Sequence, residues 1–150
     1  MQIRNVYGID LGTSTVKIYD LKKDTITKEK NMIAIRNREQ VIAVGNYAYE
    51  MHERTPSNIE VITPMSNGRI ANVLMVEAVL HTLLHRCTRH MGYRPELYFS
   101  VPCDMTEIER RSYYTIAHKG ALKTAACILW INQSRMRWHL AFRSTARRVP

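Results

Sequence analysis

The feature that most constrains the fold is a change in the spacing of apolar residues near position 70. Before it, short apolar runs are separated by turn residues, which is typical of β-strands. After it, apolar residues recur every three or four positions from Val73 to Cys87, which predicts an amphipathic helix over residues 71–90. A short apolar strand over 97–101 and a second helix over 106–119 follow. Strands combined with helices in this order predict an α/β fold, in which helices flank a mixed sheet.

Local signals set the expected boundaries of these elements. Thr106 and Glu109 have the spacing of a capping box at the start of the second helix, and Gly120 suits the position after its end. Residues 46–68 are punctuated by prolines and are expected to be irregular. The first two strands are expected to form a β-hairpin. The expected strands are 3–10, 16–19, one near Ile26, 32–35, 41–44 and 97–101.

Composition limits the class of protein. The chain has 150 residues, of which 45% are hydrophobic and 23% charged, so it suits one globular domain and excludes disordered, collagen-like and disulfide-rich classes. Its three cysteines lack metal-binding spacing and are expected to be reduced thiols. No apolar run approaches the roughly 20 residues of a membrane span. The net charge is +9. Residues 124–150 contain five arginines and no acidic residue, so they carry more than half of this excess positive charge.

One segment carries chemical information, a turn of small and hydroxyl residues between the first two strands. Asp10 precedes it, and its residues are Gly12, Thr13, Ser14 and Thr15. A hairpin tip of this composition exposes consecutive backbone N–H groups, and such a nest binds anions, most often phosphate. Glycine allows close approach of the backbone, and Asp10 is placed to hold Mg²⁺ through water. An ordinary hairpin of the same composition is the alternative interpretation.

Three segments together resemble those of a known family. Residues 7–17, Tyr-Gly-Ile-Asp-Leu-Gly-Thr-Ser-Thr-Val-Lys, resemble the first phosphate loop of the actin-type ATPases, which include actin, the DnaK-type chaperones, the sugar kinases and bacterial MreB. Residues 55–71 resemble the MreB stretch Thr-Pro … Arg-Pro-Met-x-Asp-Gly-Val-Ile-Ala, and residues 101–111 resemble Val-Pro-x-Gly-Ile-Thr-x-Val-Glu-Arg-Arg. The order and spacing of the segments resemble those of the MreB/Mbl family of bacterial actin-like, rod shape-determining proteins.

The resemblance implies an actin-like ATPase fold of the ribonuclease H-like type, with residues 1–122 as the N-terminal part of its first domain. It implies that Gly12, Thr13, Ser14 and Thr15 contact the phosphates of ATP and that Asp10 binds the hydrated Mg²⁺. Members of the family polymerise under the cytoplasmic membrane and control rod shape by organising cell-wall synthesis. The implied partners are other copies of the chain, inner-membrane cell-wall elongation proteins and the peripheral membrane surface, without nucleic acid. The implied location is cytoplasmic, at the inner face of the cell membrane.

The sequence departs from the family pattern at several positions. Ser14 and Thr15 stand where Ala-Asn is common, and both pairs keep small side chains and backbone donors, so anion binding is not threatened. Asn67 and Asp104 replace Asp and Gly, which changes the expected turn geometry. Residues 91–93 occupy the place of a membrane-contacting loop of some members. A plain helix–strand loop is the simpler interpretation, so membrane association rests on the resemblance alone.

The resemblance stops near residue 122. Residues 123–150 form an acid-free mixture rich in arginine and tryptophan, where the family has a strand, a turn and a helix. Tryptophan and methionine each have one codon, and reading the implied codons one base earlier around Trp130 permits a sequence that resembles the family continuation. We therefore expect a single-base frameshift near Lys123 and an out-of-frame, non-native tail. A basic arm that binds nucleic acid through Trp130 and Trp138 and a short amphipathic membrane helix are the alternatives.

The resemblance also implies a second phosphate loop, an adenosine pocket and a catalytic carboxylate, none of which these 150 residues contain. The family is a slow ATPase, but for this chain we assign no catalytic residue and expect no ATPase activity and a sheet that lacks its next strand. Two other functions remain open. One is an enzyme or chaperone of the same superfamily, such as a sugar kinase or an ethanolamine-utilisation chaperone. The other is a basic binding module driven by residues 124–150.

Overall fold

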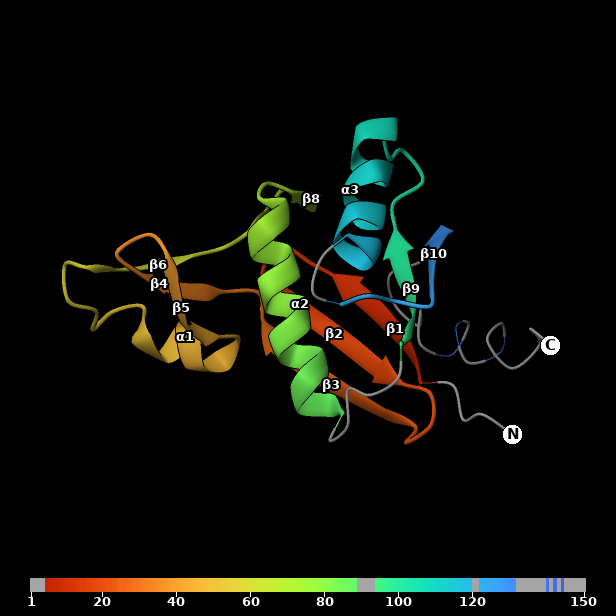
Figure 1. Ribbon diagram of the computed structural model, residues 1–150, viewed down its shortest axis with the longest axis horizontal. Helices are drawn as coiled ribbons and strands as arrows, with labels where there is room; N and C mark the ends of the chain where they lie inside the picture. Colours follow the sequence, from red (N-terminus) through yellow and green to blue (C-terminus); the bar gives the residue numbers. More distant parts are fainter. Residues whose placement is uncertain are drawn as a thin grey trace.

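A five-stranded mixed sheet is the largest element of the computed structural model, which describes residues 5–88, 94–119, 122–131, 140, 142 and 144 (Figure 1). In spatial order its strands are β10 (Ala126–Ile131), β9 (Glu96–Val101), β1 (Val6–Leu11), β2 (Thr15–Asp20) and β3 (Thr25–Lys30). The central strand β1 runs antiparallel to β2 and parallel to β9. The predicted hairpin of the first two strands and the predicted mixed sheet are therefore confirmed.

Two helices, α2 (Val73–Cys87) and α3 (Glu107–His118), lie side by side over one face of this sheet (Figure 1). Strand side chains point alternately to the two faces of a sheet. On the helix side Ile9, Val16 and Phe99 are fully buried, and they pack in one core with the apolar faces of both helices. The predicted α/β architecture, a mixed sheet with helix cover, is confirmed.

Both helices begin at a capped residue. Asn72 Oδ1 accepts the Met75 N–H of α2 at 3.1 Å. At the start of α3, Thr106 Oγ1 accepts the Glu109 N–H at 3.3 Å, and Glu109 Oε2 accepts the Thr106 N–H at 2.7 Å. The capping box predicted from the sequence is therefore confirmed. Gly120 and residues 91–93 lie outside the described residues.

A second apolar cluster covers the opposite face of the sheet. Tyr19 and Tyr98 alternate along their strands with Ile18 and Phe99, whose side chains face the helices. Phe142 packs edge-on against both tyrosine rings, with ring centroids 5.7 Å from Tyr19 and 5.0 Å from Tyr98. Each face of the sheet thus carries an apolar cluster.

The edge strand β10 differs from the sequence-based expectation. All six of its residues pair in parallel register with β9. Leu129 packs against the core beneath the helices, and Trp130 packs against the cluster on the opposite face. The expectation of a missing next strand is therefore wrong, because the apolar run of β10 supplies side chains to both faces of the sheet. The reading-frame hypothesis and the boundary at residue 122 stay predictions.

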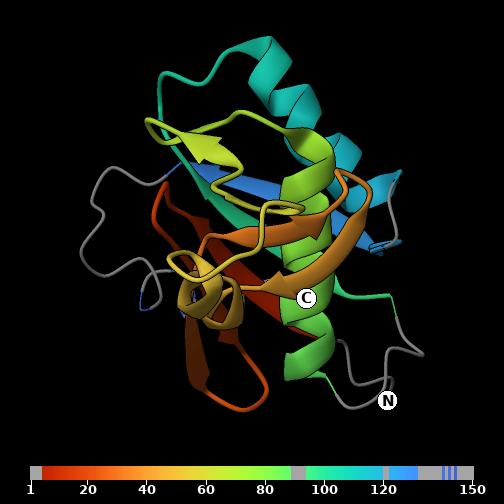
Figure 2. The same ribbon diagram turned by 90° about the vertical axis from the view of Figure 1, so that its left-hand side faces the viewer.

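A smaller lobe lies beside α2, and Figure 2 shows it from its own side. Its antiparallel sheet, in the order β5-β4-β6, packs with the short helix α1, and a separate hairpin joins β7 to β8. Residues 46–68 are therefore not irregular as expected, because such short elements give no periodic sequence signal. The bounds are β4 Ile33–Arg36, β5 Gln40–Val44, α1 Asn46–Met51, β6 Ile59–Ile62, β7 Met65–Ser66 and β8 Arg69–Ile70.

Phe142 tests whether the terminal segment belongs to the fold. Its side chain is 2% exposed, so Phe142→Ala leaves a cavity, and we expect the free energy of unfolding to fall by about 3 kcal/mol in urea titrations. Leu140→Ala is the matched control, because Leu140 is 46% exposed and its truncation is expected to cost less than about 1 kcal/mol. Unchanged stability of Phe142→Ala would instead support a non-native tail.

Candidate functional site

The turn between β1 and β2, residues 12–15, is closed by its own backbone. The Gly12 N–H donates to the Thr15 carbonyl oxygen at 2.9 Å. A Cβ atom added to Gly12 would lie 2.8 Å from that same oxygen. Because the oxygen belongs to the backbone of β2, it cannot move aside as a flexible side chain would. Glycine is therefore required at this position by close approach of the chain to itself.

Asn31 holds the 12–15 turn from the side. Its side chain is buried, and Nδ2 donates to the Gly12 carbonyl oxygen at 2.7 Å. Its backbone N–H donates to the Ser14 carbonyl oxygen at 3.0 Å. Within the described part of the chain, no hydrogen bond engages the backbone N–H groups of Thr13 and Ser14. The turn therefore directs two of its carbonyl groups to Asn31 and keeps backbone donors available for an anion.

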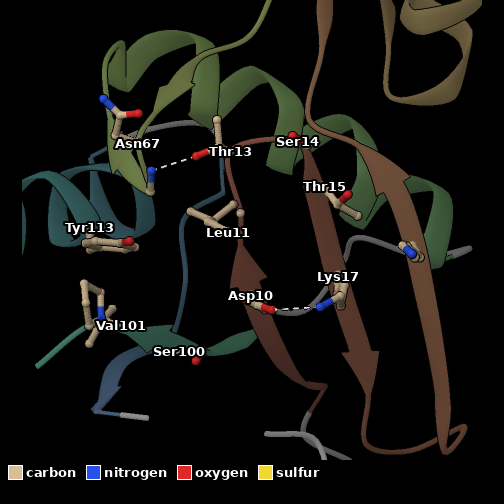
Figure 3. A pocket seen from close by; sticks show the side chains of 14 residues that line it. Asp10, Leu11, Thr13, Ser14, Thr15, Lys17, Asn67, Ser100, Val101 and Tyr113 are labelled. Carbon is tan, nitrogen blue, oxygen red and sulfur yellow. Dashed lines mark hydrogen bonds and ion pairs between the residues drawn. The ribbon is translucent and has the colours of Figure 1, made fainter. Parts of the chain in front are cut away.

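The turn borders a hollow of about 530 Å³ (Figure 3). The walls of the hollow come from the β1–β2 hairpin, β3, the tip of the β7–β8 hairpin, the end of β9 and α3. The five residues predicted to bind phosphate and magnesium all line it. The lining residues are Asp10, Leu11, Gly12, Thr13, Ser14, Thr15, Lys17, Lys28, Asn67, Gly68, Ser100, Val101, Pro102 and Tyr113.

Three charged side chains lie on neighbouring strands beside the turn. Asp10 of β1 is in register with Lys17 of β2, which is in register with Lys28 of β3. Lys17 Nζ lies 3.2 Å from Asp10 Oδ2, so these two charges compensate each other (Figure 3). Lys28 forms no ion pair with any described residue. Among these lining residues the charge is therefore net positive, which favours an anionic ligand.

Tyr113 forms the aromatic wall of the hollow. Its ring packs edge-on against Phe99, with the ring centroids 5.2 Å apart, and the residue is 4% exposed. Burial, followed by the negative charges of Glu109 and Asp10, raises the pKa of Tyr113 to about 12. The phenol therefore stays neutral at physiological pH and presents a hydrogen-bond donor rather than a charge.

The tip of the β7–β8 hairpin closes the hollow on another side. Asn67 and Gly68 have φ values of 49° and 77°, and positive φ at both central residues is what a type I′ two-residue hairpin turn requires. The Gly68 N–H donates to Thr13 Oγ1 at 2.7 Å. Asn67, which replaces the aspartate of the family pattern, thus keeps a tight turn, because asparagine tolerates positive φ.

Several residues that the fold brings to the hollow were not predicted from the sequence. Lys17 had a usable signal, because the short β1–β2 turn places it opposite Asp10 across the hairpin. Lys28 follows from Lys17 by the same reasoning across the next pair of strands. Gly68 and Tyr113 had no such signal, since they come from a separate hairpin and a helix whose packing no local pattern specifies.

Two observations limit the kinds of site that the described residues form. In the ranges that the structure describes, no three histidine, cysteine, aspartate or glutamate side chains gather as a metal site. Across the same ranges, no helix has the length and apolarity that a membrane crossing needs. Asp10 is the only carboxylate that lines the hollow in the described residues, so a metal there would depend on this one carboxylate and on water.

The fold is actin-like. The crystal structure of MreB5 of Spiroplasma citri bound to ADP matches 85% of this chain and 38% of its own length, with a TM-score of 0.72 and 25% sequence identity. The MamK double helical filament structure matches 85% of this chain and 41% of its own length, with a TM-score of 0.68 and 15% identity, which shows the fold alone. The five-stranded sheet with α2 and α3 therefore corresponds to part of a larger actin-like protein.

Comparison of sequences identifies the family. The model of the MreB/Mbl protein family matches residues 4–128. The cell shape-determining protein Mbl of Bacillus cereus is 34% identical over 119 residues, which cover 78% of this chain and 36% of Mbl. The cell shape-determining protein MreB of Escherichia coli is 34% identical over 115 residues, which cover 72% of this chain and 33% of MreB. The chain therefore belongs to the MreB/Mbl family and spans about a third of the length of these relatives.

The contact between Gly12 and Thr15 generates a stability prediction. Gly12→Ala forces a Cβ atom against the backbone, so we expect the free energy of unfolding to fall by about 1–3 kcal/mol in urea titrations. Ser14→Ala is the matched control, because the Ser14 side chain is exposed and its change is expected to stay within about 0.5 kcal/mol. Equal stability of Gly12→Ala and the unaltered chain would contradict the close approach.

The pKa of Tyr113 predicts a loss of stability at alkaline pH. Burial raises the pKa values of Tyr113 and Tyr7 to about 12, whereas an unfolded tyrosine titrates near pH 10. The folded state therefore holds these protons more tightly, so stability is full below pH 10 and falls as the pH rises towards 12. Tyr113→Phe is expected to remove roughly 2–3 kcal/mol of this alkaline loss, measured by urea titrations at several pH values. An identical pH profile in the variant would refute the assignment.

Proposed function

We propose that this chain is the part of an actin-like cell shape-determining protein that binds the phosphates of ATP. One arrangement carries the proposal: the backbone N–H groups of Thr13 and Ser14 are free of described partners and border a hollow in which Lys28 has no described counter-ion. Backbone donors in a nest combined with net positive charge favour a polyphosphate over a neutral ligand.

The residues present suit both a phosphate group and a hydrated Mg²⁺. At Gly12 a side chain would press on the backbone, so glycine preserves the tight turn whose donors would meet the phosphate. Asp10 supplies a single carboxylate, and Mg²⁺ in nucleotide sites keeps several waters and takes only one or two protein carboxylates. Lys17 holds the Asp10 carboxylate by their ion pair. When bound, Mg²⁺ would neutralise charge on the phosphates.

Relatives support a nucleotide as the ligand and cell shape as the role. The structures of MreB5 of Spiroplasma citri are described as bound to ADP and to AMPPNP. The Mbl and MreB relatives that match most of this chain are cell shape-determining proteins. Membership of this family favours the cytoskeletal role over the sugar kinase or chaperone that the sequence left open. It also favours that role over a basic binding module, because the family match covers residues 4–128, whereas such a module would depend on residues 124–150.

Filament formation belongs to the same proposal. The double helical filament of MamK, a protein of the same fold, supports self-association as the function of this architecture. We propose that the protein polymerises in the cytoplasm at the inner face of the cell membrane and organises cell-wall synthesis there. Its partners would be further copies of itself, cell-wall elongation proteins of the inner membrane and the membrane surface.

The chain itself would contribute binding rather than hydrolysis. Phosphoryl transfer depends on positioning and on stabilisation of charge from several sides of the phosphate. The hollow offers donors and lysines from one side, and Asp10 is its only carboxylate among the described residues. We therefore propose weak polyphosphate binding and no ATP hydrolysis by this chain alone.

Titration with inorganic tripolyphosphate tests the proposed function. We expect the Thr13 and Ser14 amide signals of the ¹⁵N-labelled chain to shift saturably, and Mg²⁺ to tighten binding in the unaltered chain but not in Asp10→Asn. Lys28→Gln is expected to weaken binding about three- to tenfold, equivalent to roughly 1 kcal/mol, because it removes a charged donor.

Lys22→Gln is the matched control for Lys28→Gln. It makes the same change of charge in the β2–β3 turn, outside the residues that line the hollow. Binding by Lys22→Gln is expected to stay within about twofold of the unaltered chain, since exposed charges beyond a Debye length are screened. Equal weakening by both lysine variants, or no saturable shift at the turn, would contradict a phosphate site.

A further inference from the structure

The β7–β8 hairpin forms one wall of the hollow, and among the described strands β7 and β8 pair only with each other. It forms a two-stranded sheet of its own. Its tip contacts the 12–15 turn through the hydrogen bond from the Gly68 N–H to Thr13 Oγ1. The position of this tip therefore bears directly on the conformation of the turn and on the width of the hollow.

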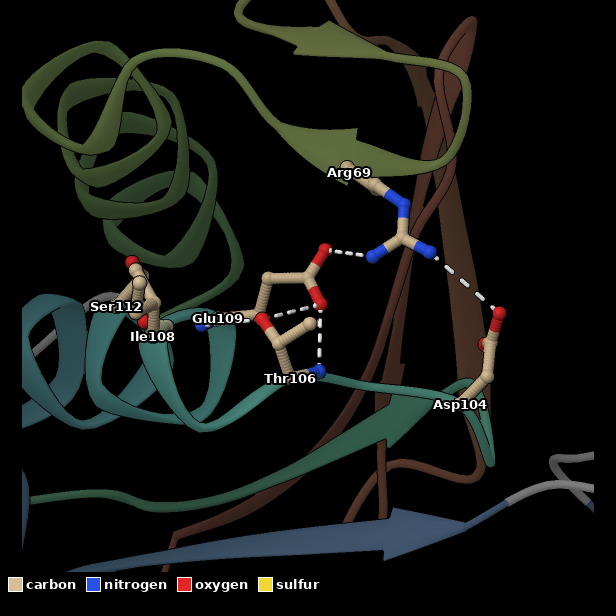
Figure 4. A network of polar contacts seen from close by, with 6 residues as sticks. All are labelled: Arg69, Asp104, Thr106, Ile108, Glu109 and Ser112. Carbon is tan, nitrogen blue, oxygen red and sulfur yellow. Dashed lines mark hydrogen bonds and ion pairs between the residues drawn. The ribbon is translucent and has the colours of Figure 1, made fainter.

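Arg69, the residue after the tip, joins the hairpin to the start of α3 (Figure 4). One guanidinium nitrogen, Nη1, donates to Glu109 Oε1, and the other, Nη2, lies 3.4 Å from Asp104 Oδ2. Arginine suits this arrangement, because its planar guanidinium group presents several donors in a fixed fork and so contacts two carboxylates at once. We call Arg69, Asp104 and Glu109 the Arg69 clamp.

The Glu109 carboxylate takes part in both the Arg69 clamp and the capping box of α3. Its Oε1 atom accepts from Arg69, while its Oε2 atom accepts from the backbone N–H and the hydroxyl group of Thr106, at 2.7 and 2.9 Å. The capping box thus fixes the carboxylate in the orientation that Arg69 meets. One turn further along the same helix, Tyr113 lines the hollow. The clamp therefore connects two opposite contributors to the hollow, the hairpin tip and α3.

We propose that Arg69 is a positioning residue for the polyphosphate site. By tying the hairpin to α3, it keeps the Gly68 N–H on the Thr13 hydroxyl group and so holds the 12–15 turn in its anion-binding conformation. Arg69 does not line the hollow and would touch no ligand. This inference rests on the proposed function for its effect on binding, whereas its effect on the hairpin is independent of any ligand.

Amide hydrogen exchange of Gly68 tests the clamp directly. Arg69→Gln is expected to speed exchange of the Gly68 amide about two- to fivefold, because exposed ion pairs contribute modestly and the hairpin would open more often. Tripolyphosphate binding is expected to weaken by a similar factor. Arg69→Lys keeps the charge but lacks the fork of donors that contacts both carboxylates. Its Gly68 exchange rate and its tripolyphosphate affinity should therefore lie between those of the unaltered chain and those of Arg69→Gln.

Arg110→Gln is the matched control. Arg110 forms an ion pair with Glu107 on the exposed side of α3, with Nε 3.5 Å from Oε2, and does not line the hollow. Arg110→Gln should leave Gly68 exchange and tripolyphosphate affinity unchanged. If the effect of Arg69→Gln came from a general weakening of α3, Arg110→Gln would change both as well. Asp104→Asn provides a second clamp variant that should fold normally, because the Asp104 side chain is 70% exposed. It should speed Gly68 exchange less than Arg69→Gln.

Two results would overturn the proposal. One is Gly68 exchange in Arg69→Gln that equals that of the unaltered chain and of Arg110→Gln. The other is faster Gly68 exchange with unchanged tripolyphosphate affinity, which would make the clamp a purely structural contact. Failure of the unaltered chain to bind tripolyphosphate would overturn the proposed function instead, and the Gly68 exchange rates would still decide whether Arg69 holds the hairpin.

Discussion

The candidate site depends on the pairing of β1 along both of its edges. β1 is antiparallel to β2 and parallel to β9, and its register places Asp10 between Lys17 and Ser100. A slip of one residue would turn Asp10 towards the helices and Ile9, which is fully buried, away from them. The burial of alternate residues beneath α2 and α3 therefore fixes which side chains stand beside the 12–15 turn. Core packing and the chemistry of the hollow are two consequences of one register.

Much of this arrangement could be predicted from the sequence because it is encoded locally. The apolar spacing in α2, the capping box at Thr106 and Glu109, and the glycine turn after Asp10 each depend on neighbours within a few residues. The helix α1 and the β7–β8 hairpin were missed because they are too short to show a period. The strand β10 was missed because its alternating contacts with two apolar clusters become visible only when β9 is beside it.

The residues of the site fall into the same two groups. Asp10 and the 12–15 turn could be recognised because one short segment holds them, and Lys17 follows from hairpin register. Tyr113 and Gly68 reach the hollow only through tertiary packing, and the Arg69 clamp joins two segments that no local pattern connects. The resulting site has donors and lysines on one side of a hollow. Because the chain spans about a third of the length of its relatives, we propose that it supplies one side of the phosphate-binding site.

We propose that the 12–15 turn and Asp10 together bind a metal–polyphosphate group. Paramagnetic broadening by Mn²⁺ in place of Mg²⁺ tests it most directly, because the effect falls steeply with distance from the metal. With tripolyphosphate present, we expect selective broadening of the Thr13 and Ser14 amide signals of the ¹⁵N-labelled chain, and loss of that selectivity in Asp10→Asn. Broadening that is spread over amides beside other carboxylates, or that is unaltered in Asp10→Asn, would contradict this site.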